Sequence, residues 1–217
     1  GSALSTKRSE PDVPVFLSGV TDGVTNGFPI CAVIENTDTR SKDYSQLWDK
    51  PRPSHADFTA RMRSGVSVDM RGGGHFSGRL TAPLCVAGGI ARQILSRRGI
   101  FIGAHLSSVA GIDDTPFPLH PTRELFDELV KKPVPAINNV SAQLMAQAIS
   151  SAAESLDSVG GVIECAVTGL DAGIGNPMFD GVENRLASAV FGVPGVKGLE
   201  FGSGFAGSGR HGSENND

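Results

Sequence analysis

The sequence predicts an α+β fold in which antiparallel β-sheets pack against helices. Runs of apolar, β-branched residues typical of strands and runs with helical spacing both occur along its 217 residues. Their order, β-β-α-α-β-α-α-β-α-β, lacks the strict alternation of a doubly wound parallel sheet. With 39% apolar residues, 19% charged residues and a net charge of −4, the composition is that of a folded globular protein.

The N-terminal part contains two predicted strands and one predicted helix. Apolar runs at 13–18 and 28–35 lie on either side of a turn-rich stretch and predict a pair of strands. After a polar loop, residues 55–63 predict a short helix with Asp57 near its start.

A longer helix is expected at 81–98, where Gly99 ends it. Its middle contains Gly88 and Gly89. Because glycine weakens a helix by about 1 kcal/mol relative to alanine, this pair predicts close packing against another element.

The remaining chain contains further strands and helices. Apolar or alternating runs predict the strands, and helical spacing of apolar residues predicts the helices. Strands are expected at 99–109, 159–170 and 196–201, and helices at 122–130, 140–156 and 183–191.

Positive charge is concentrated in residues 48–98, which carry nine basic and three acidic side chains in an otherwise acidic chain. Most of the basic residues are arginines, whose guanidinium groups suit phosphates and carboxylates. The segment therefore predicts an anion-binding surface, with a solvated basic face as the alternative. Nucleic acid is disfavoured, because the chain is acidic and has only one Trp and one Tyr to stack on bases.

Glycine is frequent, with 28 copies, and one run of three glycines, 72–74, lies between Arg71 and Arg79. Backbone amides beside a helix N-terminus bind anions, so this run predicts an anion or phosphate site, with a tight structural turn as the alternative. Residues 202–207 match the dinucleotide fingerprint G-x-G-x-x-G, but no helix-forming sequence follows. We interpret them as a flexible loop.

His55 lies beside Arg52 and Asp57 at the start of the short predicted helix. Histidine titrates near neutral pH, so His55 is a candidate general acid toward a leaving phosphate. A helix-capping or core histidine is the alternative. No metal site is predicted, because His55 has no further ligand at a recognisable spacing and His105, His120 and His211 are isolated.

The sequence contains no run of about 18 apolar residues that could span a bilayer and no secretory leader, so a cytoplasmic protein is expected. The three cysteines, Cys31, Cys85 and Cys165, are widely spaced within apolar runs. We expect them to be buried and to form no disulfide framework.

Several motifs, taken together and in order, resemble the chorismate synthase family. The resemblance extends over essentially all 217 residues, and several motifs in register are far more specific than one glycine pattern. The motifs lie at residues 17–20, 25–30, 36–44, 52–57, 71–81, 157–164, 173–180, 196–202 and 212–217.

This resemblance implies a lyase that catalyses the last common step of the shikimate pathway in aromatic amino acid biosynthesis. The reaction is the trans-1,4 elimination of phosphate from 5-enolpyruvylshikimate 3-phosphate to give chorismate, with reduced FMN (FMNH2) as cofactor and NADPH as a candidate reductant. The resemblance also implies a cytoplasmic, homotetrameric flavoprotein with a layered β-α-β sandwich of antiparallel sheets around helices. Its expected binding partner is this small-molecule substrate, and binding to nucleic acid or to a membrane is not expected.

The resemblance also assigns residues to the site, although residues 75–81 depart from the commoner family pattern Arg-Ser-Ser-Ala-Arg-Glu-Thr. The candidate catalytic residue is His55, the candidate FMN contacts are His75, Phe76 and Ser77, and the candidates for binding the anionic substrate are Arg52, Arg71 and Arg79.

The family has further segments on both sides of the matched region, including a Gly-Glu-Ser-His-Gly segment with a second histidine before it and a Lys-Pro-Thr motif after it. We therefore expect residues 1–217 to form a single chorismate synthase domain truncated at both ends. The alternative is a catalytically incomplete fragment that acts only as a flavin- or phosphate-binding or structural module.

Overall fold

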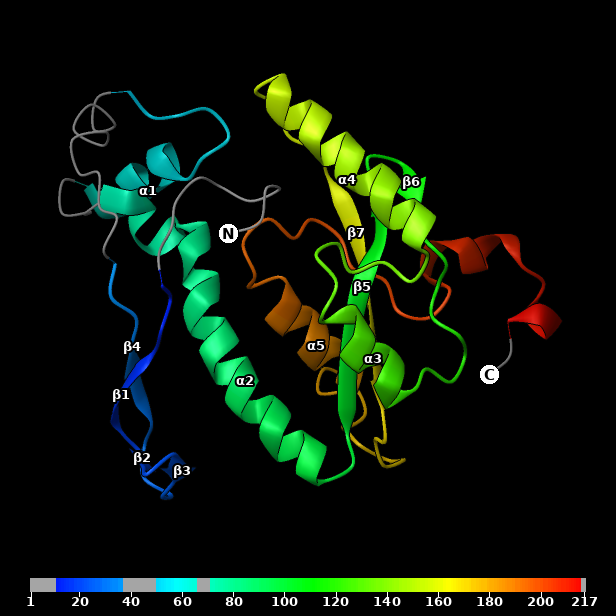
Figure 1. Cartoon of the computed structure of the whole chain (residues 1–217), viewed down its shortest axis with the longest axis horizontal. Helices are drawn as coiled ribbons and strands as arrows, with labels where there is room; N and C mark the ends of the chain where they lie inside the picture. The colour runs from blue at the N-terminus through cyan, green and yellow to red at the C-terminus, as the bar shows by residue number, and fades with distance from the viewer. Residues whose placement is uncertain (1–10, 37–49, 66–70, 216–217) are drawn as a thin grey trace. The chain divides into compact units, whose positions relative to one another are not determined.

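The computed structural model describes residues 11–36, 50–65 and 71–215, without the side chains of residues 71 and 72. The helices and strands follow one another in an order that does not strictly alternate, and all the paired strands described are antiparallel, which confirms the predicted α+β class (Figure 1). Two compact units are interleaved in the sequence: one combines residues 1–38 with 86–171, and the other combines 39–85 with 172–217.

The first unit begins with two small antiparallel pairs of strands. The two strands predicted here are confirmed, although the observed ones are shorter. Asp22 and Gly23 both have positive φ, at 50° and 77°, which is the conformation that a tight two-residue hairpin turn requires. The pairs are β1 (Val15–Ser18) with β4 (Cys31–Val33), and β2 (Val20–Thr21) with β3 (Val24–Thr25).

The centre of the first unit is a three-stranded sheet in the order β6-β5-β7. The chain turns from β5 into β6 at Ala110 and Gly111, both with positive φ. The β5–β7 register places His105 opposite Glu164. The strands are β5 (Phe101–Val109), β6 (Ile112–Asp113) and β7 (Gly161–Thr168).

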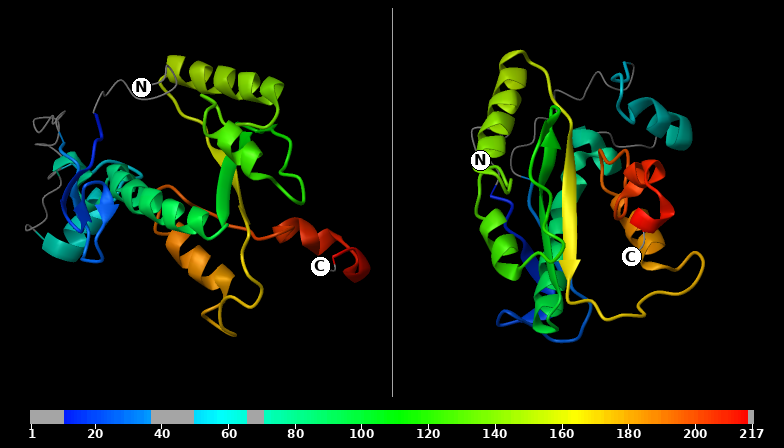
Figure 2. Two further views of the ribbon diagram at one scale, coloured as in Figure 1. Left: turned by 60° about the horizontal axis from the view of Figure 1, so that its bottom comes forward. Right: turned by 90° about the vertical axis from the view of Figure 1, so that its right-hand side faces the viewer.

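Two helices, α3 (Arg123–Leu129) and α4 (Asn139–Glu154), lie on the same side of this sheet (Figure 2). Each begins at a side-chain cap: Thr122 accepts from Leu125 N–H, and Asn138 accepts from Val140 N–H. The buried apolar side chains of the unit gather where these helices and the chain between them meet the sheet. They are Val109, Phe126, Leu129, Val134, Ala136 and Met145.

Several side chains on the opposite face of the sheet are exposed in the described part of the chain. Ile163 and Val167 of β7 and Ile102 of β5 are exposed, and so is Cys165. Cys31 and Cys85 are exposed as well. The three cysteines are therefore free, as predicted, but the expectation that they are buried is wrong.

Three more helices have bounds close to the predicted ones: α1 (Asp57–Ser64), α2 (Thr81–Arg97) and α5 (Val182–Val190). The expected packing at Gly88 and Gly89 is wrong, because a Cβ added to either would meet no described atom within 4 Å. Among the described helices, none combines the length and apolar character needed to cross a membrane.

The strand predicted at 196–201 does not form. Extended backbone becomes a strand only when a neighbouring strand accepts and donates its hydrogen bonds, and no such partner is present for this segment in the described part of the chain. A 3₁₀-helix, η5 (Gly204–Gly209), follows in place of the predicted flexible loop. The dinucleotide fingerprint therefore lacks both its strand and its helix.

Candidate functional site

The predicted catalytic region contains an ion pair between Arg52 and Asp57. Arg52 donates from Nε to Asp57 Oδ2 at 2.8 Å and from Nη2 to Oδ1 at 3.0 Å, and its backbone N–H donates to Oδ2 at 3.0 Å. Asp57 is only 5% exposed. The Arg52 guanidinium lowers the pKa of Asp57 to about 2, so this carboxyl group is ionised at neutral pH.

His55 is exposed on the turn before α1. Ser54 has a positive φ of 60°, and this turn brings His55 Nδ1 to 2.9 Å from the carbonyl oxygen of Pro53. A carbonyl oxygen only accepts, so Nδ1 carries the hydrogen in this contact. Since the N-cap of α1 is Ala56, His55 is neither the cap nor a core residue.

The segment between Arg71 and Thr81 folds as two 3₁₀ turns, η3 (Arg71–Phe76) and η4 (Gly78–Leu80). Several amides near the glycine run donate within the segment: Ser77 N–H to Gly74 O at 3.2 Å, and Leu80 N–H to Ser77 O at 3.1 Å. Ser77 Oγ accepts from Arg79 N–H at 3.2 Å and so caps η4.

The other candidate site residues of this segment differ in their exposure to solvent. His75 and Phe76 are both exposed, whereas Ser77 and Arg79 are partly buried. The Arg71 side chain lies outside the described residues. The structure thus brings Arg52, His55 and Asp57 together, and separately joins Ser77 to Arg79.

A second polar cluster lies in the first unit and is centred on His105. This residue is only 1% exposed, and its ring nitrogens contact two carboxylates. Nδ1 lies 2.9 Å from Asp114 Oδ2, and Nε2 lies 2.7 Å from Glu164 Oε2. This cluster could not be recognised from the sequence, because Glu164 is 59 positions away along the chain and no local pattern links it to His105.

Asp114 is ionised in this cluster. Burial opposes its charge, but backbone N–H groups of Asn138, Ile137 and Thr115 and the His105 ring hydrogen-bond the carboxylate and together hold its pKa below the usual value of 3.8. Within the described ranges, no group of three or more His, Cys, Asp or Glu side chains is arranged to hold a metal ion.

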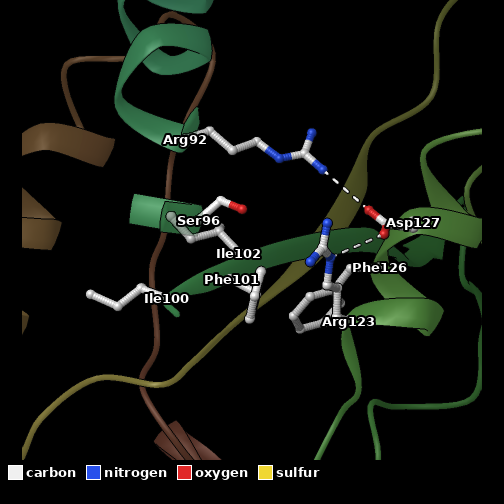
Figure 3. A pocket seen from close by; sticks show the side chains of 8 residues that line it. All are labelled: Arg92, Ser96, Ile100, Phe101, Ile102, Arg123, Phe126 and Asp127. Atoms are coloured by element: carbon white, nitrogen blue, oxygen red, sulfur yellow. Dashed lines mark ion pairs between the residues drawn. The ribbon is translucent and has the colours of Figure 1, made fainter. Parts of the chain in front are cut away.

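A small cavity of about 60 Å³ lies between α2, β5 and α3 (Figure 3). Arg92 and Arg123 both point toward Asp127, with N–O distances of 3.7 and 3.5 Å. The Arg123 guanidinium also lies over the Phe101 ring, 4.9 Å from its centre. Because one carboxylate lies between the two guanidinium groups, we assign no anion to this cavity.

Comparison with known proteins identifies the family. The sequence model of the chorismate synthase family matches residues 1–217. The chain belongs to the chorismate synthase family. Similar proteins named chorismate synthase come from Lancefieldella parvula (44% identical over 98% of this chain and 59% of the relative), Chitinophaga pinensis (43%, over 100% and 56%) and Korarchaeum cryptofilum (41%, over 100% and 59%).

A solved chorismate synthase structure has the same fold, with a TM-score of 0.70 and 23% sequence identity over 94% of this chain and 57% of that one. The family resemblance inferred from the sequence motifs is therefore confirmed. The chain spans between 56% and 59% of the length of the three relatives described above.

Proposed function

We propose that this protein catalyses the chorismate synthase reaction, the elimination of phosphate from 5-enolpyruvylshikimate 3-phosphate to give chorismate. The observation that carries the proposal is the match of residues 1–217 to the family, with relatives at 41–44% identity over nearly the whole chain. The substrate carries a phosphate and two carboxylates, so the positive charge of residues 48–98 supports the proposal independently.

His55 is the proposed acid. Its exposure leaves the ring open to a ligand, and because Nδ1 contacts the Pro53 carbonyl, Nε2 is the ring nitrogen left to contact one. A protonated Nε2 would donate to an oxygen of the departing phosphate or to the flavin. The neighbouring Arg52–Asp57 pair would hold the turn in place and keep Arg52 beside the site.

Reduced FMN is the proposed cofactor, and it would lend electron density as the bond between carbon and the phosphate oxygen breaks. The chemistry of the η3–η4 segment fits such a group: Phe76 offers an exposed aromatic ring, His75 an exposed hydrogen-bonding ring and Ser77 a hydroxyl whose hydrogen remains able to donate. Arg71 and Arg79, on either side of the glycine run, would bind phosphate or carboxylate groups.

The wider family properties belong to the same proposal. We infer that residues 1–217 form one domain of a cytoplasmic homotetramer, that the relatives' additional length corresponds to further parts of the site, and that NADPH is a candidate reductant for the flavin. The second candidate function is a flavin- or phosphate-binding module without turnover, and the positive charge of residues 48–98 favours it, because that charge would bind phosphate groups whether or not a reaction follows.

The role of His55 is tested by anaerobic phosphate release from 5-enolpyruvylshikimate 3-phosphate, using protein expressed from the whole gene and loaded with reduced FMN. We expect His55→Ala to lower kcat by about 10²–10⁴-fold, the range for loss of a general acid, with little change in melting temperature because the side chain is exposed. His120→Ala, at another exposed histidine, is the matched control and should keep the wild-type rate. Equal rates for the two variants would remove His55 from the mechanism.

A further inference from the structure

The turn between β3 and β4 contains an asparagine followed directly by a glycine, Asn26 and Gly27, and the proposed reaction uses neither residue. Both are exposed. Gly27 has a positive φ of 85°, and a Cβ added to it would meet no described atom within 4 Å. The main-chain nitrogen of Gly27 therefore lacks the steric cover that a side chain at this position would give.

The Asn26 side chain folds back over its own main chain. Its Oδ1 accepts from Phe28 N–H at 3.1 Å, and its Nδ2 donates to Thr21 Oγ1 at 3.1 Å. The first contact is an Asx turn, in which a side-chain carbonyl takes the place of a backbone carbonyl. It holds the side-chain carbonyl carbon, Cγ, beside the peptide bond between Asn26 and Gly27.

The groups around this carbonyl fit an intramolecular reaction of the asparagine. Gly27 N–H donates to no atom among the described residues, so its nitrogen is not held in another hydrogen bond. Phe28 N–H points at the oxygen on which negative charge develops when a nucleophile adds to Cγ. Residues 26–28 thus bring together a nucleophile, an electrophilic carbon and an oxyanion donor.

We propose that Asn26 is a site of spontaneous modification. The Gly27 nitrogen attacks Asn26 Cγ, the bond from Cγ to Nδ2 breaks, and the proton of Gly27 N–H leaves on the departing ammonia, which gives a cyclic succinimide. Water then opens the ring at either carbonyl. The products are aspartate at position 26, or isoaspartate, in which the main chain runs through Cγ.

Two other asparagines show why the reaction is specific to this turn. Asn138 has the same kind of contact, because its Oδ1 accepts from Val140 N–H at 2.8 Å, but the next residue is the first of α4 and carries a side chain. Asn176 is followed by Pro177, whose nitrogen has no hydrogen and cannot form the ring. Of these three asparagines, only Asn26 combines the contact with a following glycine.

The two products have different effects on the strands. Asn26 N–H donates to Gly19 O at 3.1 Å, and a Cβ added to Gly19 would lie 2.7 Å from Pro29 O, so the chain passes very close to itself here. Aspartate leaves the main chain as it is, and the Thr21 hydroxyl can donate to the new carboxylate. Isoaspartate adds one carbon to the main chain just before β4, so we expect it to disturb the pairing of β4 with β1.

The first test is peptide mass spectrometry of protein expressed from the whole gene and stored folded at physiological temperature in a mildly alkaline buffer. We expect the peptide that contains Asn26 to gain one mass unit, with an isoaspartyl form present, before the Asn138 peptide changes, while the Asn176 peptide keeps its mass. An Asn26 peptide that stays unmodified as long as the Asn138 peptide would overturn the proposal. This comparison needs no variant.

A pair of glycine variants separates the reaction from strain in the turn. Gly27→Ala places a methyl group beside the attacking nitrogen and should lower the modification rate at Asn26 to that at Asn138. Gly23→Ala is the matched control, because Gly23 also has a positive φ, 77°, with nothing within 4 Å of an added Cβ, and it should keep the wild-type rate. Equal rates in the two variants would contradict the assigned chemistry.

Hydrogen exchange tests the structural consequence. After chromatography separates the two products, we expect the amides of residues 31–33 to exchange faster in the isoaspartyl form than in the aspartyl form. Freshly purified Asn26→Asp is the reference, because it has the aspartyl sequence without isoaspartate, and it should exchange like the unmodified protein. The same exchange in both products would overturn the claim that the added carbon disturbs β4.

Discussion

The Arg52–Asp57 ion pair is the contact that ties the turn of His55 to α1. Asp57 is almost fully buried and receives three hydrogen bonds from one residue, so it acts as a structural anchor for the candidate catalytic turn. The sequence suggested that Arg52 binds an anion, and the structure shows that Arg52 binds the carboxylate of Asp57. A substrate anion would therefore meet an arginine whose Nε and Nη2 already donate to the protein.

The pair gives a pH-dependent prediction. Because the pKa of Asp57 is lowered from 3.8 to about 2, the ion pair contributes about 2 kcal/mol that is present above pH ~4 and is lost as the pH falls toward 2. We expect Asp57→Asn to lower the free energy of unfolding by about that amount at pH 7 and to have little effect near pH 2. Urea unfolding at both pH values measures the difference.

Asp171→Asn is the control for that comparison, because Asp171 is exposed and has no side-chain hydrogen bond or ion pair among the described contacts. If the two asparagine variants lose the same stability at pH 7, the Arg52–Asp57 pair is not the anchor that its geometry indicates. A loss for Asp57→Asn that is equally large at pH 2 would point instead to packing around the side chain.

Local sequence motifs indicate the candidate site residues, whereas the residues with structural roles could not be recognised from the sequence. His55 could be found because its neighbours match a family motif along the chain. The partners of His105 could not, since they come from different strands and depend on the β5–β7 register. The capping role of Ser77 was likewise hidden, because it depends on the 3₁₀ turn that follows.

The helices and long strands were well predicted because their signals are local. Helical spacing placed α2, α3, α4 and α5 within a few residues of their observed bounds. The strand expected at 196–201 failed because pairing depends on a partner elsewhere in the protein, which no local run can specify.

The glycines also show that local sequence cannot predict contacts between distant parts of the chain. The prediction of close packing at Gly88 and Gly89 was wrong, whereas Gly103, which the sequence did not single out, lies directly beneath the Phe126 ring. Since α3 rests on β5 at this point, the absence of a side chain at Gly103 sets how closely the helix approaches the sheet.

This contrast predicts opposite effects of the same substitution. Gly103→Ala should destabilise the protein by about 1–3 kcal/mol, because the new methyl group would overlap the Phe126 ring. Gly89→Ala, in α2, should be neutral or stabilise it by up to about 1 kcal/mol, because alanine favours the helix and the added Cβ meets nothing nearby. Melting temperatures of the two variants measure both effects. If Gly103→Ala keeps the wild-type melting temperature, α3 does not pack tightly against β5 at this position.

Within the described residues, the sheet of the first unit has helices on one face and exposed apolar side chains on the other. Helices α3 and α4 bury one side of the β6-β5-β7 sheet, while Ile102, Ile163 and Val167 remain exposed on the other. The chain spans 56–59% of the length of the three relatives described above. The sequence motifs predicted the family, and the order of the predicted strands and helices predicted the α+β class. Both signals can be recognised in the sequence without knowing which segments lie together in the fold.

We propose that this protein carries the activity of its family. The most direct measurement is anaerobic release of phosphate from 5-enolpyruvylshikimate 3-phosphate by protein expressed from the whole gene, with reduced FMN, with oxidised FMN and without flavin. We expect phosphate and chorismate in equal amounts with reduced FMN and neither product in the other two reactions. Tight binding of reduced FMN without phosphate release would contradict it and would favour the binding module.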